Sequence, residues 1–197
     1  MYSTEPSTDL TPAHRRLLLR LARDAIAHGL RTGRPPAVDP DRFDEPLRAR
    51  RATFVTLEKE GRLRGCIGHL EAIQPLVMDV AENAFNAAFR DPRFPPVEAS
   101  ELDALEIHIS VLSPPEPMQF ESEADLLRQL RPGVDGLILE EGPYKGTFLP
   151  SVWEQLPDPH QFLAQLKLKA GLPPNHWSAR MRVWRYTTES FSEAEFA

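Results

Sequence analysis

The fold is decided by one stretch of the chain, residues 53–70, which reads TFVTLEKEGRLRGCIGHL. Residues 53–57 favour an extended strand, 58–61 are polar and end in Gly61, and 63–70 form a second extended run. Two runs joined by a short polar turn predict a β-hairpin. The paired strands are therefore antiparallel and need no crossover helix between them.

Further strands are predicted after this hairpin in the sequence. Residues 105–111 alternate between apolar and polar side chains, which predicts a strand with one buried face and His108 on the other. A second hairpin is predicted over 137–149, with its turn at 140–143, and residues 181–187 are predicted as the last strand.

Four helices are predicted from apolar spacing and capping residues. The first spans 12–31 after the N-cap Thr11, and the second starts at Pro75 and ends before Pro92. The third spans 123–130 after Ser122, and the fourth follows Asp158 towards Gly171. Hairpins without regular strand–helix–strand units predict an α+β fold, a mostly antiparallel sheet flanked by helices. The proline-rich stretch 34–46 reads as a long connection, where a lobe boundary could fall.

The composition narrows the class of protein. Of 197 residues, 41% are hydrophobic and 26% charged, so disorder and coiled coil are excluded. A net charge of −6 makes nucleic-acid binding by phosphate neutralisation unfavourable. A polar, flexible segment at 1–11 and the lack of a long apolar run predict no signal peptide, no membrane span and a cytoplasmic location.

The single cysteine, Cys66, is the first candidate for chemistry. One thiol excludes an internal disulfide, a Cys-x-x-Cys pair and the three-cysteine cradle of a radical cluster enzyme. Two glycines beside it indicate a bulge or a close approach to the backbone. Strand alternation predicts Arg64, Cys66 and Gly68 on one face, where the cation would favour the thiolate. The alternative is a buried cysteine that packs as a small apolar residue.

Metal binding is not predicted. His69 and Glu71 share one face of a strand and would supply half of a ligand set. The other histidines lie at no recognised ligand spacing, so the sequence indicates no metal site and identifies no cofactor.

Four longer blocks carry a family resemblance: LRGCIG at 63–68, AFRDPRFPP at 88–96, ISVLSP at 109–114 and GTFLPSVW at 146–153. With them the chain resembles the AMMECR domain family, of the AmmeMemoRadiSam system protein A type, over residues 12–191. The resemblance implies one domain of two lobes, a larger one built on an antiparallel sheet and a smaller one, with the Arg-Gly-Cys-Ile-Gly segment near a groove between them. It also implies two partners, a MEMO-like protein and a radical S-adenosylmethionine (radical SAM) enzyme, in a shared modification pathway.

Two hypotheses of function follow. The first is an accessory or binding protein that acts with those partners. The alternative is a thiol-dependent enzyme with Cys66 as nucleophile, Arg64 stabilising its thiolate and the backbone amides near Gly65 and Gly68 binding an oxyanion. The residues expected to line the groove are Gly65, Ile67, Gly68, His69, Asn83, Arg93 and Thr147.

Overall fold

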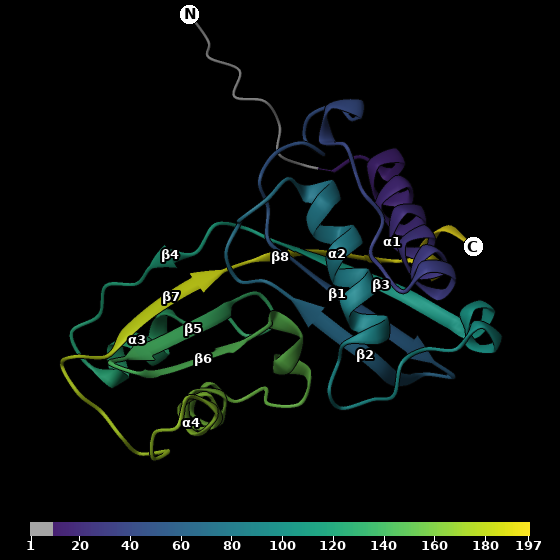
Figure 1. The fold of residues 1–197 in the computed structure, drawn as a ribbon. Helices are drawn as coiled ribbons and strands as arrows, with labels where there is room; N and C mark the ends of the chain where they lie inside the picture. The colour runs from purple at the N-terminus through teal and green to yellow at the C-terminus, as the bar shows by residue number, and fades with distance from the viewer. Residues whose placement is uncertain (1–9) are drawn as a thin grey trace, which may run out of the picture. The chain divides into compact units, whose positions relative to one another are not determined.

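The computed structural model describes residues 10–197, which form two compact units (Figure 1). Unit 1 comprises the chain up to Leu112 together with Glu189–Ala197, and unit 2 comprises Ser113–Thr188. Of the segment predicted to be flexible, 1–11, residues 1–9 lie outside the described residues. Leu10 is buried in the core of unit 1, and Thr11 caps the first helix.

Unit 1 is a four-stranded sheet packed against two helices. The sheet order is β2-β1-β3-β8, with the strands at Thr53–Lys59 (β1), Arg62–Gly68 (β2), Leu105–Leu112 (β3) and Thr188–Ser192 (β8). The helices α1 (Pro12–Thr32) and α2 (Leu76–Phe89) lie side by side, and α2 packs against β1 and β2. Their apolar faces and the inner residues of β1 and β3 form one buried core.

The sequence explains these elements locally. Thr11 accepts a hydrogen bond from the His14 amide and Gly33 ends α1 in the left-handed conformation, as the capping pattern predicts. In β3 the apolar residues of the alternation are buried and His108 lies on the opposite face, which confirms that prediction. The hairpin of β1 and β2 is confirmed as well.

Unit 2 holds a second antiparallel sheet, of order β4-β7-β5-β6. Its strands are Glu116–Pro117 (β4), Gly136–Glu141 (β5), Tyr144–Phe148 (β6) and Arg182–Tyr186 (β7), and its helices are Glu123–Gln129 (α3) and Pro159–Ala170 (α4). The core centres on Trp153 and Phe162, whose rings stack with their centroids 3.8 Å apart. The second hairpin and both helices agree with the sequence prediction.

The predicted α+β class with mostly antiparallel strands is confirmed, and three finer expectations need correction. The antiparallel strands form two sheets rather than one, because β7 ends at Tyr186 and the chain enters a further strand, β8, in the sheet of unit 1. The stretch 181–187 is therefore not the last strand. The proline-rich stretch 34–46 lies inside unit 1 and contains a short 3-10 helix at Pro40–Arg42, so it does not separate the units.

Candidate functional site

The Arg-Gly-Cys-Ile-Gly segment forms the second half of β2, and Gly65 sets how closely α2 approaches it. A Cβ at Gly65 would stand 2.1 Å from the carbonyl oxygen of Ala87 in α2. Gly68 is also closely packed, since a Cβ added there would lie 2.3 Å from the Phe54 ring. Ile67, between them, packs against the core. The glycines thus allow the close backbone approach that the sequence indicated.

Cys66 is half-buried on the face of β2 opposite Gly65. The Thr56 hydroxyl on β1 donates a hydrogen bond to its Sγ at 3.2 Å. Its backbone N–H donates to the carboxylate of Asp91 at 3.0 Å. Arg93 binds the same carboxylate through Nε and Nη2, at 3.0 and 2.7 Å, and Nη2 also reaches the Cys66 carbonyl oxygen at 3.4 Å. Asp91 therefore fixes both the Cys66 backbone and the Arg93 side chain.

This arrangement changes the electrostatics of the segment. The Arg93 guanidinium, followed by the Cys66 amide, holds the pKa of the Asp91 carboxyl far below its usual value. Arg93, which comes from the connection that follows α2, thus brings a cation to the Cys66 backbone.

Arg64 has a different partner from the one the alternation predicts. Leu57 pairs with Gly65 and Glu58 with Leu63, so Arg64 is the extra residue of a β-bulge. Its guanidinium binds both carboxylate oxygens of Glu101, at 3.1 Å each. Glu101 also binds Lys59, and its pKa falls to about 2, chiefly through the Arg64 hydrogen bonds. The prediction that Arg64 shares a face with Cys66 is wrong because the bulge interrupts the alternation.

A second polar cluster surrounds Asp79 of α2, which is fully buried. Its carboxylate accepts hydrogen bonds from the Thr53 hydroxyl at 2.6 Å and the Asn83 amide at 3.0 Å. Nδ1 of His69 lies 2.7 Å from Oδ1, and the Gln74 amide donates to the same oxygen at 3.0 Å. An aspartate that holds one imidazole nitrogen sets the tautomer and direction of the ring. His69 and Asn83, both predicted as site residues, are thus brought together by a carboxylate that the sequence did not single out.

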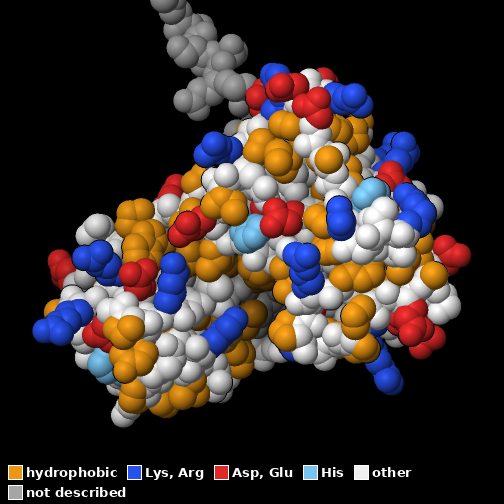
Figure 2. All heavy atoms as spheres, viewed as in Figure 1, with side chains coloured by type: hydrophobic (Ala, Val, Ile, Leu, Met, Phe, Trp, Pro, Cys, Tyr) orange, Lys and Arg blue, Asp and Glu red, His pale blue; other side chains and the backbone are white. Residues whose placement is uncertain are grey.

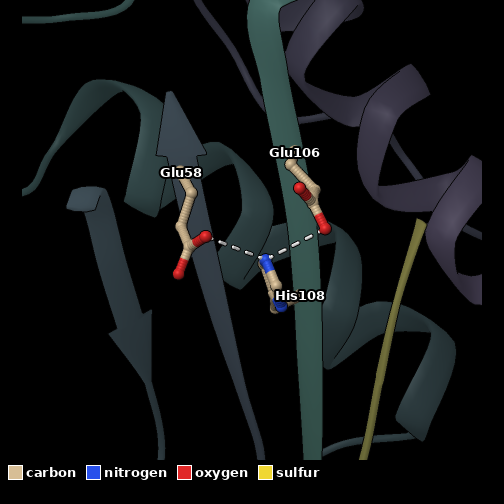
Figure 3. A group of neighbouring side chains, drawn as sticks. All are labelled: Glu58, Glu106 and His108. Carbon is tan, nitrogen blue, oxygen red and sulfur yellow. Dashed lines mark ion pairs between the residues drawn. The ribbon is translucent and has the colours of Figure 1, made fainter. Parts of the chain in front are cut away.

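The polar face of the unit 1 sheet adds residues that sequence reasoning missed. Thr56 pairs with Cys66 on one side and with His108 on the other, so the three share one row across β2, β1 and β3. In the next row Glu58 pairs with Glu106, and both carboxylates face the His108 ring (Figure 3). The available signal was the Glu-x-His spacing of Glu106 and His108 on a predicted strand.

Thr147 is the one predicted groove residue outside unit 1. It lies on β6 of unit 2, where its hydroxyl donates to the Leu137 carbonyl at 2.8 Å and lies 3.1 Å from the Tyr186 hydroxyl. The other six lie in unit 1, on β2, on α2 or in the connections that follow them. The groove itself, with Thr147 among its residues, stays a prediction.

Known proteins match this chain over nearly its full length. The AMMECR1 family model matches residues 19–191. The chain belongs to the AMMECR1 family. A protein of Methanothermobacter thermautotrophicus is 45% identical over 180 residues, covering 90% of this chain and 93% of the relative. The crystal structure of the uncharacterized protein PH0010 from Pyrococcus horikoshii matches with a TM-score of 0.81 at 40% identity and covers 90% of each chain.

The surface of this AMMECR1-family chain carries charges of both signs. On the face shown in Figure 2, Lys and Arg side chains are interspersed with Asp, Glu and hydrophobic side chains. Within residues 10–197, no helix has the length and apolar character needed to cross a bilayer.

Proposed function

We propose that this AMMECR1-family chain is an accessory binding protein that works in the cytoplasm with a MEMO-like protein and a radical SAM enzyme in a modification pathway. The family resemblance supplies the partners. One structural observation supports a binding role: two carboxylates of unit 1 hold the Arg64 side chain and the Cys66 backbone of the Arg-Gly-Cys-Ile-Gly segment. Arg64 is paired with Glu101, and the Cys66 amide and Arg93 are both held by Asp91. A segment fixed in this way presents a rigid surface rather than free reactive groups.

An exposed apolar residue on this segment provides the test. Leu63 is 44% exposed and precedes the bulge. Val134 in unit 2 has the same exposed fraction and serves as a matched control. A charge at a contact point in a protein interface disfavours association, whereas the same change elsewhere on the surface is neutral.

The experiment measures binding of the purified chain to the MEMO-like and radical SAM proteins encoded by the same genome, separately and together. We expect binding that Cys66→Ser retains, Leu63→Glu weakens at least tenfold and Val134→Glu leaves unchanged. Absence of binding to either protein contradicts the proposal. Equal weakening by Leu63→Glu and Val134→Glu contradicts the placement of the surface.

A thiol-dependent enzyme is the second candidate, and two contacts favour it. The Thr56 hydroxyl donates to the Cys66 Sγ, and Arg93 Nη2 lies 3.4 Å from the Cys66 carbonyl oxygen, so the thiol has a hydrogen-bond donor and the segment has a cation beside it. The rate of iodoacetamide labelling against pH tests it in the native and the denatured protein. A native titration well below about 8.5 that Arg93→Gln moves upward supports an activated thiol. Labelling only after denaturation rules it out.

A further inference from the structure

We infer that Glu58, Glu106 and His108 form a binding site for a divalent transition-metal ion on the polar face of the unit 1 sheet (Figure 3). None of these three residues belongs to the predicted groove or to the thiol alternative, and the site requires neither of the proposed partners.

The backbone fixes all three side chains on one face. Glu58 on β1 pairs directly with Glu106 on β3, and His108 follows Glu106 by two residues on the same strand. Residues two apart on a strand point to the same side. Because β1 and β3 lie in the middle of the sheet, the ligands would be held by rigid elements rather than by loops.

The distances match a coordination sphere. Nε2 of His108 lies 3.3 Å from a carboxylate oxygen of Glu58 and 3.4 Å from one of Glu106. The three ligand atoms all lie within 4.8 Å of one another. Ligands at about 2.0–2.2 Å from a tetrahedral metal ion are separated by roughly 3.4 Å. Small side-chain adjustments would bring the wider pair into that range.

The electrostatics call for a cation at this point. Two glutamates directly opposite on neighbouring strands repel each other. His108 Nε2 is shielded from solvent and has no hydrogen-bond partner among the described residues, although two carboxylates face it. A metal ion bound between the three side chains would satisfy Nε2 and both carboxylates at once.

The donor set selects the class of ion. One imidazole nitrogen and two carboxylate oxygens suit Zn²⁺ or Mn²⁺, whereas Mg²⁺ and Ca²⁺ prefer oxygen ligands alone. Three protein ligands leave a coordination position for water or a substrate, as in catalytic rather than structural zinc sites. Thr56 separates His108 from Cys66 in the same row, so the candidate site and the thiol belong to the same face of the sheet, two strands apart.

Calorimetric titration of the metal-free full-length chain with Zn²⁺, and separately with Mn²⁺, tests the site. We expect one ion per chain for the wild type and a loss of affinity of at least about 100-fold in the double variant Glu58→Gln/Glu106→Gln, since even changes to groups that only orient ligands cost 10–100-fold. The matched control is His176→Ala. This substitution removes a histidine whose Nε2 lies 2.5 Å from a single carboxylate, that of Glu141. The His176→Ala variant should bind the metal ion with wild-type affinity.

Thermal unfolding gives a second readout that separates ligation from folding. Without metal the double variant should unfold at the wild-type temperature or above it, because one repulsion has been removed. Zn²⁺ should raise the unfolding temperature of the wild type but not that of the variant. Absence of one-to-one binding, unchanged affinity in the double variant, or an equal loss in Cys66→Ser would overturn the assignment.

Discussion

Gly65→Ala tests whether close packing between β2 and α2 holds the candidate site in place. The new Cβ would lie 2.1 Å from the Ala87 carbonyl oxygen and 3.0 Å from the carbonyl carbon. Favourable contacts between heavy atoms start at about 3.5 Å, so the strand and the helix must separate by about 1 Å or more. Both opposing atoms belong to helix backbone, so no side-chain rotation can relieve the overlap.

We expect this substitution to destabilise unit 1 by about 3 kcal/mol, the upper part of the range for overpacked cores. With a urea m-value of about 2 kcal/mol/M, the unfolding midpoint falls by about 1.5 M. Gly33→Ala is the control: among residues 10–197, no atom beyond its two chain neighbours lies within 4 Å of a Cβ at this position, and only the φ of 70° is unfavourable. That strain costs about 1 kcal/mol.

The chain provides a separate probe for each unit. Its three tryptophans all lie in unit 2, while its single cysteine lies in unit 1. The rise of the thiol-labelling rate above its value in the native protein at increasing urea therefore follows unit 1, and tryptophan fluorescence follows unit 2. A Gly65→Ala midpoint by thiol labelling no lower than that of Gly33→Ala would refute the packing argument.

Three further predictions concern buried and paired groups. Asp79→Ala should cost about 3 kcal/mol in urea unfolding, because it removes the acceptor shared by Thr53, Asn83 and His69, whereas the exposed Asp24→Ala should change little. Glu101→Gln should remove part of the acid sensitivity. The folded-state pKa of Glu101 is about 2 and its ordinary value is 4.5, so the unfolded chain takes up the proton first, and wild-type stability is lost as the pH falls from about 5 to 2. If the unfolding free energy of Glu101→Gln falls with pH as steeply as that of the wild type in this window, Glu101 does not contribute to the acid sensitivity. Burial raises the pKa of Tyr186 to about 12, so one tyrosine should titrate late in an absorbance titration and be missing from Tyr186→Phe.

Much of the fold was predictable because it depends on local signals. Caps at Thr11, Ser122 and Asp158 define three helix starts, and the alternation in β3 identifies its buried face. The second sheet was not predicted. Strand β8 follows β7 almost without a break, and nothing in the local pattern shows that the two pair with different neighbours.

The site was only partly predictable, since its contacts join residues far apart in the sequence. Cys66, His69, Asn83 and Arg93 are all placed close to structural carboxylates, but Asp79 and Asp91 were not recognised as the groups that hold them. A buried aspartate on a helix looks the same in sequence as an exposed one. Its burial shows only when β1 and β2 are packed against α2.

The bulge at Arg64 determines which face of the sheet the Cys66 thiol points to. Counting back from the turn, Lys59 pairs with Arg62 and Glu58 with Leu63. An unbroken ladder would then pair Val55 with Cys66 and turn the thiol towards the core, because Val55 is fully buried. The extra residue shifts the register by one, so that Cys66 faces Thr56 on the polar side and Gly65 fits beneath α2. Deleting Arg64 should therefore remove the bulge but keep Gly65 opposite Leu57 and Cys66 opposite Thr56, so the folded variant should retain wild-type thiol labelling and lose only the Arg64–Glu101 pair. A folded variant whose thiol no longer labels would show that the strand register does not set the face of Cys66.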